Sequence, residues 1–287
     1  MAIKGLKKPV FGDYNYNGAA ATYTNGFVCG KAVEYSAEIE TSDNNPLYGD
    51  DEIAENDYGT FSSGTLTLNT TDLDHETSMR LLSLKKVQVQ VGEVQVTELV
   101  TDDDAKAKPK GFGIVEVHQI NDIDKYRALI LTKVTPQIPA DAATTKRESI
   151  EWQTKEIECL IQRSDEESEN YKHPWKREAW FNTYAEAEEY LKTVLNALDT
   201  LTATSAAGTS SGKTKITIIN PVDGASYKYS TEGPAATYKQ DLTSWTDLTP
   251  GEDITATNGS TLYIAQVNSD KKAIAAGTVT VVANEGP

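Results

Sequence analysis

The sequence predicts a mainly β protein, in which a β-sandwich or barrel flanked by one α-helix is followed by a second, smaller β-sandwich. Apolar and polar residues alternate along many short segments with the period of two that half-buried strands require. Turn-forming residues separate these segments, and only residues 184–199 show a strong helical period. With 287 residues the chain is long enough for two domains.

The N-terminal residues 1–25 are rich in Gly, Asn, Tyr and Thr and show no clear periodicity. We therefore expect an extended arm, anchored by Phe11, Tyr14 and Tyr16 rather than by a core of its own. From 26 to 40 apolar residues alternate with glutamates, which predicts a half-buried strand.

Residues 41–59 interrupt this pattern with turn and breaker residues, and the segment is strongly acidic. Loops of this length are uncommon, and they are usually functional or disordered. We expect a long acidic loop whose isolated apolar residues are Leu47, Tyr48, Ile53 and Tyr58.

The next segments are assigned from their periodicity and their turn signals. We expect strands at 59–70, at 87–96 with a turn at Gly92, at 111–135 as a hairpin around Asn121-Asp122, and at 148–163. A short helix is predicted over 72–84, and residues 101–110 and 164–178 are expected to be polar loops. Thr183 and Glu186 form a capping box, which starts the helix at about 184–199.

The composition changes near residue 202. Residues 202–213 have the small-residue composition of a flexible linker, so we place a first domain over 1–201 and a second over 214–287. The second domain reads as short strands with turns between them, typical of a small immunoglobulin-like sandwich. Its expected inward pairs are Ile216 and Ile218, Tyr227 and Tyr229, Leu262 and Ile264, and Val279 and Val281, with Trp245 as a core residue.

Charge and cysteine content restrict the class of protein. The formal net charge of −16 repels a polyanion, which disfavours a conventional nucleic-acid binder. The two cysteines, Cys29 and Cys159, lie in strand-like segments, where buried reduced thiols are common, so we favour free thiols while a single disulfide between them stays open. Because no signal-peptide core or membrane-spanning stretch is found, we expect a soluble protein made in the cytoplasm, with no membrane partner.

No motif selects a catalytic, cofactor-binding or metal-binding residue. The nearest match to a phosphate loop, residues 207–214, has Ala207 where glycine is needed and follows a helix and linker rather than a strand. The three histidines, His75, His118 and His173, have no partners at metal or triad spacing, and no acidic cluster matches a calcium loop. We therefore expect that the protein is not an enzyme and binds no cofactor. The hypothesis that it is a hydrolase rests only on the abundance of carboxylates.

A second class of function stays open, namely carbohydrate binding or adhesion. Trp175 and Trp180 lie close together beside Lys176 and Arg177, and exposed aromatic rings can stack on sugars. Packing or an interface explains the same residues equally well. Such an adhesin would use the C-terminal β-sandwich and would bind host cell-surface glycans.

Three segments stand out, namely the one from Gly5-Leu6-Lys7, the strand Ala32 to Glu40 after Thr24-Asn25-Gly26, and Asn45 to Asp51. These segments, Asn45 to Asp51 most strongly, resemble the major tail proteins, or tail tube proteins, of long-tailed phages that infect Gram-positive bacteria. The resemblance covers roughly residues 1–200. The C-terminal part resembles the immunoglobulin-like domains that are often appended to phage tail and capsid proteins.

This resemblance implies a structural virion protein that forms hexameric rings, which stack into a hollow tube for DNA during genome ejection. It implies contacts with copies of the same chain and with the tape measure, tail terminator and baseplate proteins. DNA would pass through the lumen without being bound specifically. The loop, ordered by neighbouring subunits, and the N-terminal arm would make the assembly contacts. We assign these to Asn45, Pro46, Leu47, Tyr48, Asp50, Asp51, Ile53 and Tyr58 in the loop, and Phe11, Tyr14 and Tyr16 in the arm.

Overall fold

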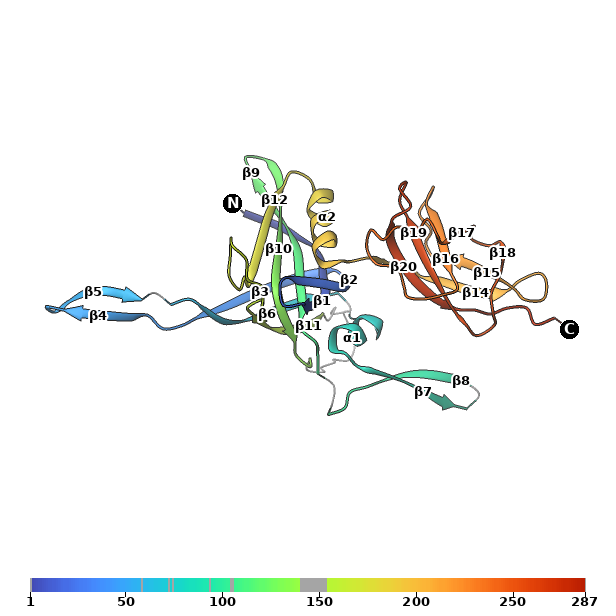
Figure 1. The fold of residues 1–287 in the computed structure, drawn as a ribbon, viewed down its shortest axis with the longest axis horizontal. Coiled ribbons are helices and arrows are strands. Elements are labelled where there is room, and N and C mark those ends of the chain that lie inside the picture. Colours follow the sequence, from blue (N-terminus) through green and yellow to red (C-terminus); the bar gives the residue numbers. More distant parts are fainter. Residues whose placement is uncertain are drawn as a thin grey trace, which may run out of the picture. The chain divides into compact units, whose positions relative to one another are not determined.

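The computed structural model describes residues 2–57, 59–71, 73, 75–92, 94–103, 106–139 and 154–286. The mainly β prediction is confirmed, with 57% strand and 7% helix (Figure 1). The chain divides into two compact units, of which the first holds Met1–Tyr23 and Cys29–Leu195 and the second holds Thr24–Val28 and Asn196–Pro287.

An eight-stranded sheet with the order β2-β1-β9-β10-β11-β6-β3 makes up most of the first unit, apart from Thr24–Val28 at the end of β2. The eighth strand, β12, pairs with the first half of β10, while the last residues of β10 pair with β11. The strands are β1 (Ala2–Tyr16), β2 (Ala21–Val28), β3 (Ala32–Thr41), β6 (Phe61–Thr70), β9 (Lys110–Ile120), β10 (Ile123–Pro136), β11 (Lys155–Gln162) and β12 (Lys176–Phe181).

The two faces of β9 are both buried, and this places β9 at the centre of the first unit. On one face α2 (Tyr184–Leu195) covers β9, and a Cβ added at Gly113 would lie within 3 Å of Leu191 and Leu195. On the other face Phe112 contacts Phe11 of β1 at a ring distance of 5.1 Å and Tyr35 of β3 at 6.4 Å. The sheet therefore curls until β3 lies across the face of β9.

The turns predicted at Asn121-Asp122 and at Gly92 are confirmed, and each joins the two strands of a hairpin. Asn121 and Asp122 both adopt positive φ between β9 and β10, as a type I′ turn requires. Gly92, with φ of +62°, follows β7 (Lys85–Val91) and precedes β8 (Val94–Val100). The predicted helices are confirmed as α1 (His75–Leu82) and α2, although α2 ends at Leu195 rather than near 199.

The N-terminal arm prediction was wrong, because residues 2–16 form strand β1 between β2 and β9. Register shifts between Ile3 and Gly5 and between Lys7 and Val10 interrupt its alternation. These β-bulges conceal the period of two on which the sequence prediction depends.

Three further segments differ from the prediction. The expected loop 41–59 contains the hairpin β4 (Asn45–Gly49) and β5 (Glu52–Asp57), which lies beyond the ends of β3 and β6 in Figure 1. The expected linker contains β14 (Ala203–Ala207), which pairs with β15. The end of the expected polar loop 164–178 begins β12. Half of the strand predicted at 148–163 is confirmed as β11, and residues 148–153 lie outside the described part of the chain.

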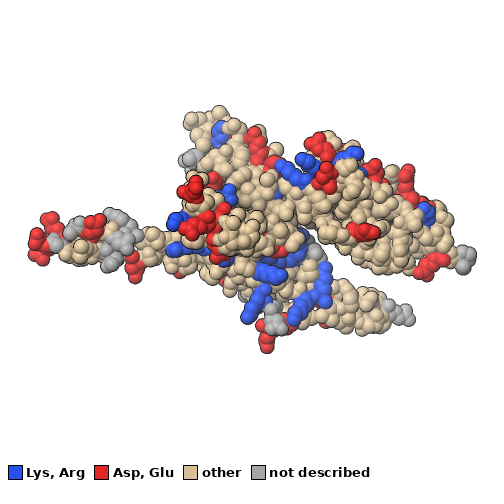
Figure 2. Space-filling model, in the orientation of Figure 1, with Lys and Arg blue, Asp and Glu red and all other residues tan. Residues whose placement is uncertain are grey.

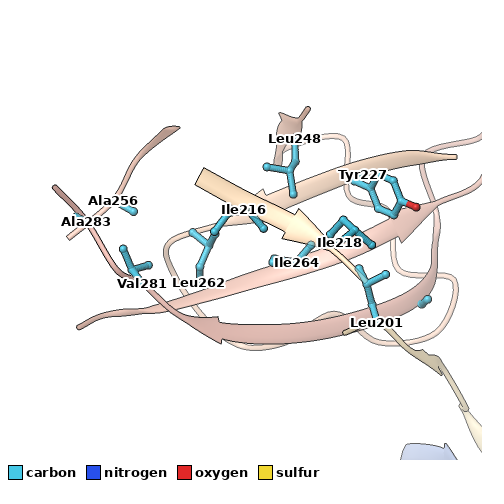
Figure 3. Close-up of a cluster of buried hydrophobic side chains, with 11 residues drawn as sticks. Leu201, Ile216, Ile218, Tyr227, Leu248, Ala256, Leu262, Ile264, Val281 and Ala283 are labelled. Atoms are coloured by element: carbon cyan, nitrogen blue, oxygen red, sulfur yellow. The ribbon is translucent and has the colours of Figure 1, made fainter. Parts of the chain in front are cut away.

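The second unit encloses its own core between two sheets, with the orders β13-β20-β19-β16-β17 and β14-β15-β18. Side chains from both sheets meet in one cluster, in which Ile216 and Ile218 face Leu262 and Ile264 (Figure 3). The predicted inward residues are buried or partly buried, Trp245 among them. The remaining strands are β13 (Asp199–Thr200), β15 (Lys213–Ile218), β16 (Ser226–Ser230), β17 (Thr246–Leu248), β18 (Asp253–Thr255), β19 (Thr261–Val267) and β20 (Ala273–Thr280).

Candidate assembly surfaces

The β4–β5 hairpin exposes large apolar side chains to solvent. Leu47 is 64% exposed, Tyr48 65% and Ile53 58%. Tyr48 pairs directly with Ile53, so both side chains project from the same face of the ribbon, while Leu47 pairs with Glu55 on the other face. The side chains predicted as assembly contacts are therefore displayed on a two-stranded ribbon rather than on a loop.

The tip of this hairpin is acidic. Asp50 and Asp51 form the turn with φ of 49° and 65°, a left-handed conformation that aspartate tolerates better than most residues. Glu52 follows them, and Figure 2 shows acidic side chains along this ribbon. At the base, Asn45 pairs with Asp57 and Pro46 with Asn56. Tyr58 lies outside the described residues.

Of the three residues predicted for the arm, Phe11 is not available to a partner and Tyr14 is only partly exposed. Phe11 is fully buried in the core of the first unit. The Tyr14 hydroxyl donates to Asp165 Oδ2 at 3.1 Å and accepts from the Asp165 backbone amide at 2.8 Å, which fixes its ring. Tyr16 is 42% exposed and is the most accessible of the three to a neighbouring molecule.

A second ribbon, β7–β8, was not assigned an assembly role from the sequence. Its register places six valines on one face, because Val91 lies opposite Val94, Val89 lies opposite Val96, and Val87 and Val100 share their parity. Glu98, opposite Val87, lies on the same face. Four of the six are more than 40% exposed, namely Val87, Val91, Val94 and Val96. The opposite face is polar, with Gln88 donating to Thr97 Oγ1 at 2.8 Å. The alternation of valine and glutamine was the sequence signal for this valine face.

Both ribbons form two-stranded sheets of their own, and among the described residues no third strand pairs with either. A two-stranded hairpin is marginally stable in water by itself. Clustered exposed apolar side chains on a protein surface usually mark an interaction site. The two ribbons are therefore the strongest candidates for contacts with other molecules.

The outer face of the β3–β6–β11 sheet is acidic. Burial alternates along β6 and β11, which turns Leu66, Leu68, Ile157 and Ile161 inward and leaves most of the polar residues and Leu160 in solvent. Strand β3 is mostly exposed, Val33 and Ile39 included. The register places Glu34 and Glu156 on either side of Asn69, with Glu158 opposite Thr67. The exposed glutamates of this face, which carries no lysine or arginine at its paired positions, are Glu34, Glu38, Glu40, Glu156 and Glu158.

A buried polar network lies where β3, β9 and β10 meet. The Glu116 carboxylate accepts hydrogen bonds from the Tyr35 hydroxyl and from Arg127 Nη1 at 3.0 Å, and His118 Nε2 lies 2.7 Å away. Burial alone would raise the pKa of Glu116, but the bonds from Tyr35 and His118 and the charge of Arg127 outweigh it and lower this pKa. Arg127 also pairs with Glu178 of β12. A carboxylate bonded in this way links β9 to β3 and β10 through charge-assisted hydrogen bonds.

The residues that could support other chemistry are separated in the structure. His118 belongs to the network above, and His173 Nδ1 contacts the Ser164 carbonyl at 3.2 Å. Among the described residues no group of three His, Cys, Asp or Glu side chains could hold a metal ion. The phosphate-loop-like segment 207–214 joins β14 to β15, so a strand follows it where a helix would be required.

The two tryptophans proposed for sugar binding have different surroundings. Trp175 stacks on Phe61 at a ring distance of 4.7 Å, whereas Trp180 contacts His118 and remains 43% exposed. In the second unit, a hollow of about 350 Å³ is lined by residues that include Tyr227. Tyr227 is only 6% exposed, and its hydroxyl accepts from the Val222 amide, so it presents no open ring for stacking.

The predicted state of the cysteines is confirmed, because Cys29 and Cys159 are fully buried and form no disulfide. None of the helices in the described parts of the chain is long and apolar enough to cross a membrane. Neither the known protein-family models nor the curated proteins include a match to this sequence.

Proposed function

We propose that this chain is a non-catalytic structural protein that assembles with copies of itself through its two β-ribbons. The observation that carries the proposal is the exposure of clustered apolar side chains on both ribbons, Tyr48 with Ile53 on one and four valines on the other. Burial of such faces between subunits gives the association free energy, at about 25 cal/mol for each Å² of apolar surface removed from water.

More specifically, we propose a tail tube subunit of a long-tailed phage, with rings of six copies stacked into a hollow tube in the virion. The strand β3 supports this proposal, because it is the last strand of its sheet and its outer edge has no partner among the described residues. An exposed edge strand can pair with a strand from a neighbouring molecule. Ring formation would cover this edge.

The acidic face of β3–β6–β11 is the surface that we assign to the lumen. Its five glutamates would repel the phosphate backbone of DNA, which allows passage without adhesion during genome ejection. The second unit, for which we propose an immunoglobulin-like fold, would lie outside the tube. Tape measure, terminator and baseplate proteins would be the other partners.

Electron microscopy and light scattering of the purified protein over a concentration series test this proposal. We expect rings or tubes of uniform width, with an assembled fraction that rises with concentration. A second measurement adds DNA in low salt, and we expect no retention of DNA by the protein. A monodisperse monomer at every concentration would contradict self-assembly, whereas tight DNA binding would contradict the proposed role as a conduit through which DNA passes without adhesion.

A further inference from the structure

We infer that the valine face of β7–β8 in one copy packs on the Tyr48–Ile53 face of β4–β5 in a neighbouring copy. This inference rests on the proposed self-assembly and specifies which two surfaces meet. Both surfaces are faces of two-stranded ribbons, and both are exposed within the described part of the chain. An aromatic ring and an isoleucine against branched valines make the kind of contact that β-sheet faces form in packed cores.

The surface that packs on the valine face is the Tyr48–Ile53 face of a second copy, not the valine face of that copy. A valine face packed on another valine face would be a two-fold contact and would stop at a dimer. A contact between two different faces is heterologous, so each copy uses both of its ribbons and the assembly closes into a ring or continues. The two ribbons of one chain supply the two halves that such a contact needs.

Charge determines the orientation of the two ribbons. The tip of β4–β5 carries Asp50 and Asp51, while the base of β7–β8 carries Lys85 and Lys86. The Lys85 side chain stays 54% exposed although it pairs with Asp102 of its own chain. An antiparallel arrangement brings the acidic tip of one copy to the lysines of the other. A parallel arrangement would leave these charges apart, so complementarity favours the antiparallel one.

The chemistry of the valine face also favours a protein partner. Residues 87–91 and 94–97 hold only valine, glutamine and threonine, so the middle of the ribbon has no cation for a phosphate group. The lysines Lys85 and Lys86 lie at the base, where Asp102 pairs with Lys85 and Glu98 lies opposite Val87. A neighbouring ribbon with an apolar face and an acidic tip matches both features.

The first test compares Val94→Glu with Gln95→Glu. The two positions are adjacent on β8 and project from opposite faces, so the added charge is the same and only the face differs. We expect Val94→Glu to raise the concentration needed for assembly about tenfold or more, since a buried valine is lost to a charge. Gln95→Glu should change it less than about threefold. Circular dichroism confirms that both variants are folded.

The second test identifies the partner surface by charge reversal. Asp50→Lys with Asp51→Lys should suppress assembly, and adding Lys85→Glu with Lys86→Glu to the same chain should restore it. Cysteine pairing provides a direct check, because Cys29 and Cys159 are fully buried. A mixture of Tyr48→Cys and Val96→Cys proteins should form a mixed disulfide.

The outcomes separate the two proposals. If the wild-type protein never assembles, both the proposed function and this inference fail. If the wild-type protein assembles, and Val94→Glu assembles equally well without any mixed disulfide, only this inference fails. Disulfides between two Val96→Cys copies, in place of mixed ones, would establish a two-fold contact and also overturn it.

Discussion

Lys8 of β1 forms an ion pair with Glu188 of α2, and Lys192, one helical turn further along α2, lies 2.7 Å from the same carboxylate. Burial of Glu188 opposes its ionisation, but hydrogen bonds from Lys192, Lys8 and Tyr184 outweigh burial and lower its pKa to about 2. Glu188 therefore connects the helix to the sheet only while it is charged.

The first prediction concerns the acid stability of this connection. A carboxyl whose pKa is lowered by folding stabilises the protein above its unfolded-state pKa and loses that contribution as the pH falls through the folded-state pKa. The free energy of unfolding should therefore fall between about pH 4.5 and pH 2. Glu188→Gln removes the titrating carboxyl and should therefore reduce that fall by about 1–2 kcal/mol. The effect is no larger because the side chain is partly exposed and solvent screens the ion pair.

Urea unfolding at a series of pH values measures this effect. Lys8→Met removes one of the two cations and should reduce the fall in the same direction, but less. An unchanged pH dependence in Glu188→Gln would show that the ion pair does not contribute to stability in solution.

A second prediction concerns the Glu116 network. Glu116→Gln leaves the partly buried Arg127 without its buried anion, so we expect a loss of about 2–3 kcal/mol in the free energy of unfolding. Glu178→Gln is the control, since Glu178 pairs with the same arginine but its side chain is 40% exposed. It should cost less than about 1 kcal/mol. Equal losses in the two variants would contradict the role given to burial.

The elements that sequence patterns predicted correctly are those whose signals are local. Asn121-Asp122 marks a turn wherever it occurs between strands, and Gly92 supplies a left-handed residue. Thr183 and Glu186 form the expected capping box, with the Thr183 amide donating to Glu186 Oε2 at 3.1 Å. Each signal depends on fewer than five neighbouring residues, so no knowledge of the remaining fold is needed.

The missed elements depend on residues that are distant in the sequence. Strand β12 has charged residues on both parities, and only its pairing with β10 makes it a strand. Asp50-Asp51 reads as a breaker, although it forms a hairpin turn. The acidic face needs Glu34 and Glu156 to lie on either side of β6, and no local pattern brings β3 and β11 to the same strand.

A third prediction follows from the close approach of β1 to α2. A Cβ added at Gly12 would lie 2.5 Å from the Leu195 backbone oxygen, a contact that no side-chain rotation can relieve. Gly12→Ala should therefore lower the free energy of unfolding by about 2–3 kcal/mol. Gly5, on the same strand, has no atom within 4 Å of such a Cβ.

Gly5→Ala is thus the matched control, and it should change stability by less than about 0.5 kcal/mol. Thermal or urea unfolding of the two variants beside the wild type measures both values. A Gly12→Ala protein as stable as Gly5→Ala would mean that the end of α2 shifts away from β1 without cost.

A fourth prediction concerns the boundary of the second unit. A fragment that starts at residue 214, as the sequence suggested, would omit β14 and with it all five of the residue pairs that β14 makes with β15. It would also omit Leu201, which is 8% exposed within the core in Figure 3. Losing a buried leucine costs about 2–5 kcal/mol, and the exposed edge of β15 would favour aggregation.

A fragment of residues 196–287 should therefore unfold cooperatively and give a dispersed NMR spectrum, whereas residues 214–287 should not. The longer fragment carrying Leu201→Ala separates the two causes, because it keeps β14 and loses only the core side chain. We expect its unfolding midpoint to lie below that of the unmodified longer fragment, while the transition stays cooperative. Cooperative unfolding of the 214–287 fragment at the midpoint of the longer one would show that β14 is not an integral strand of the second unit.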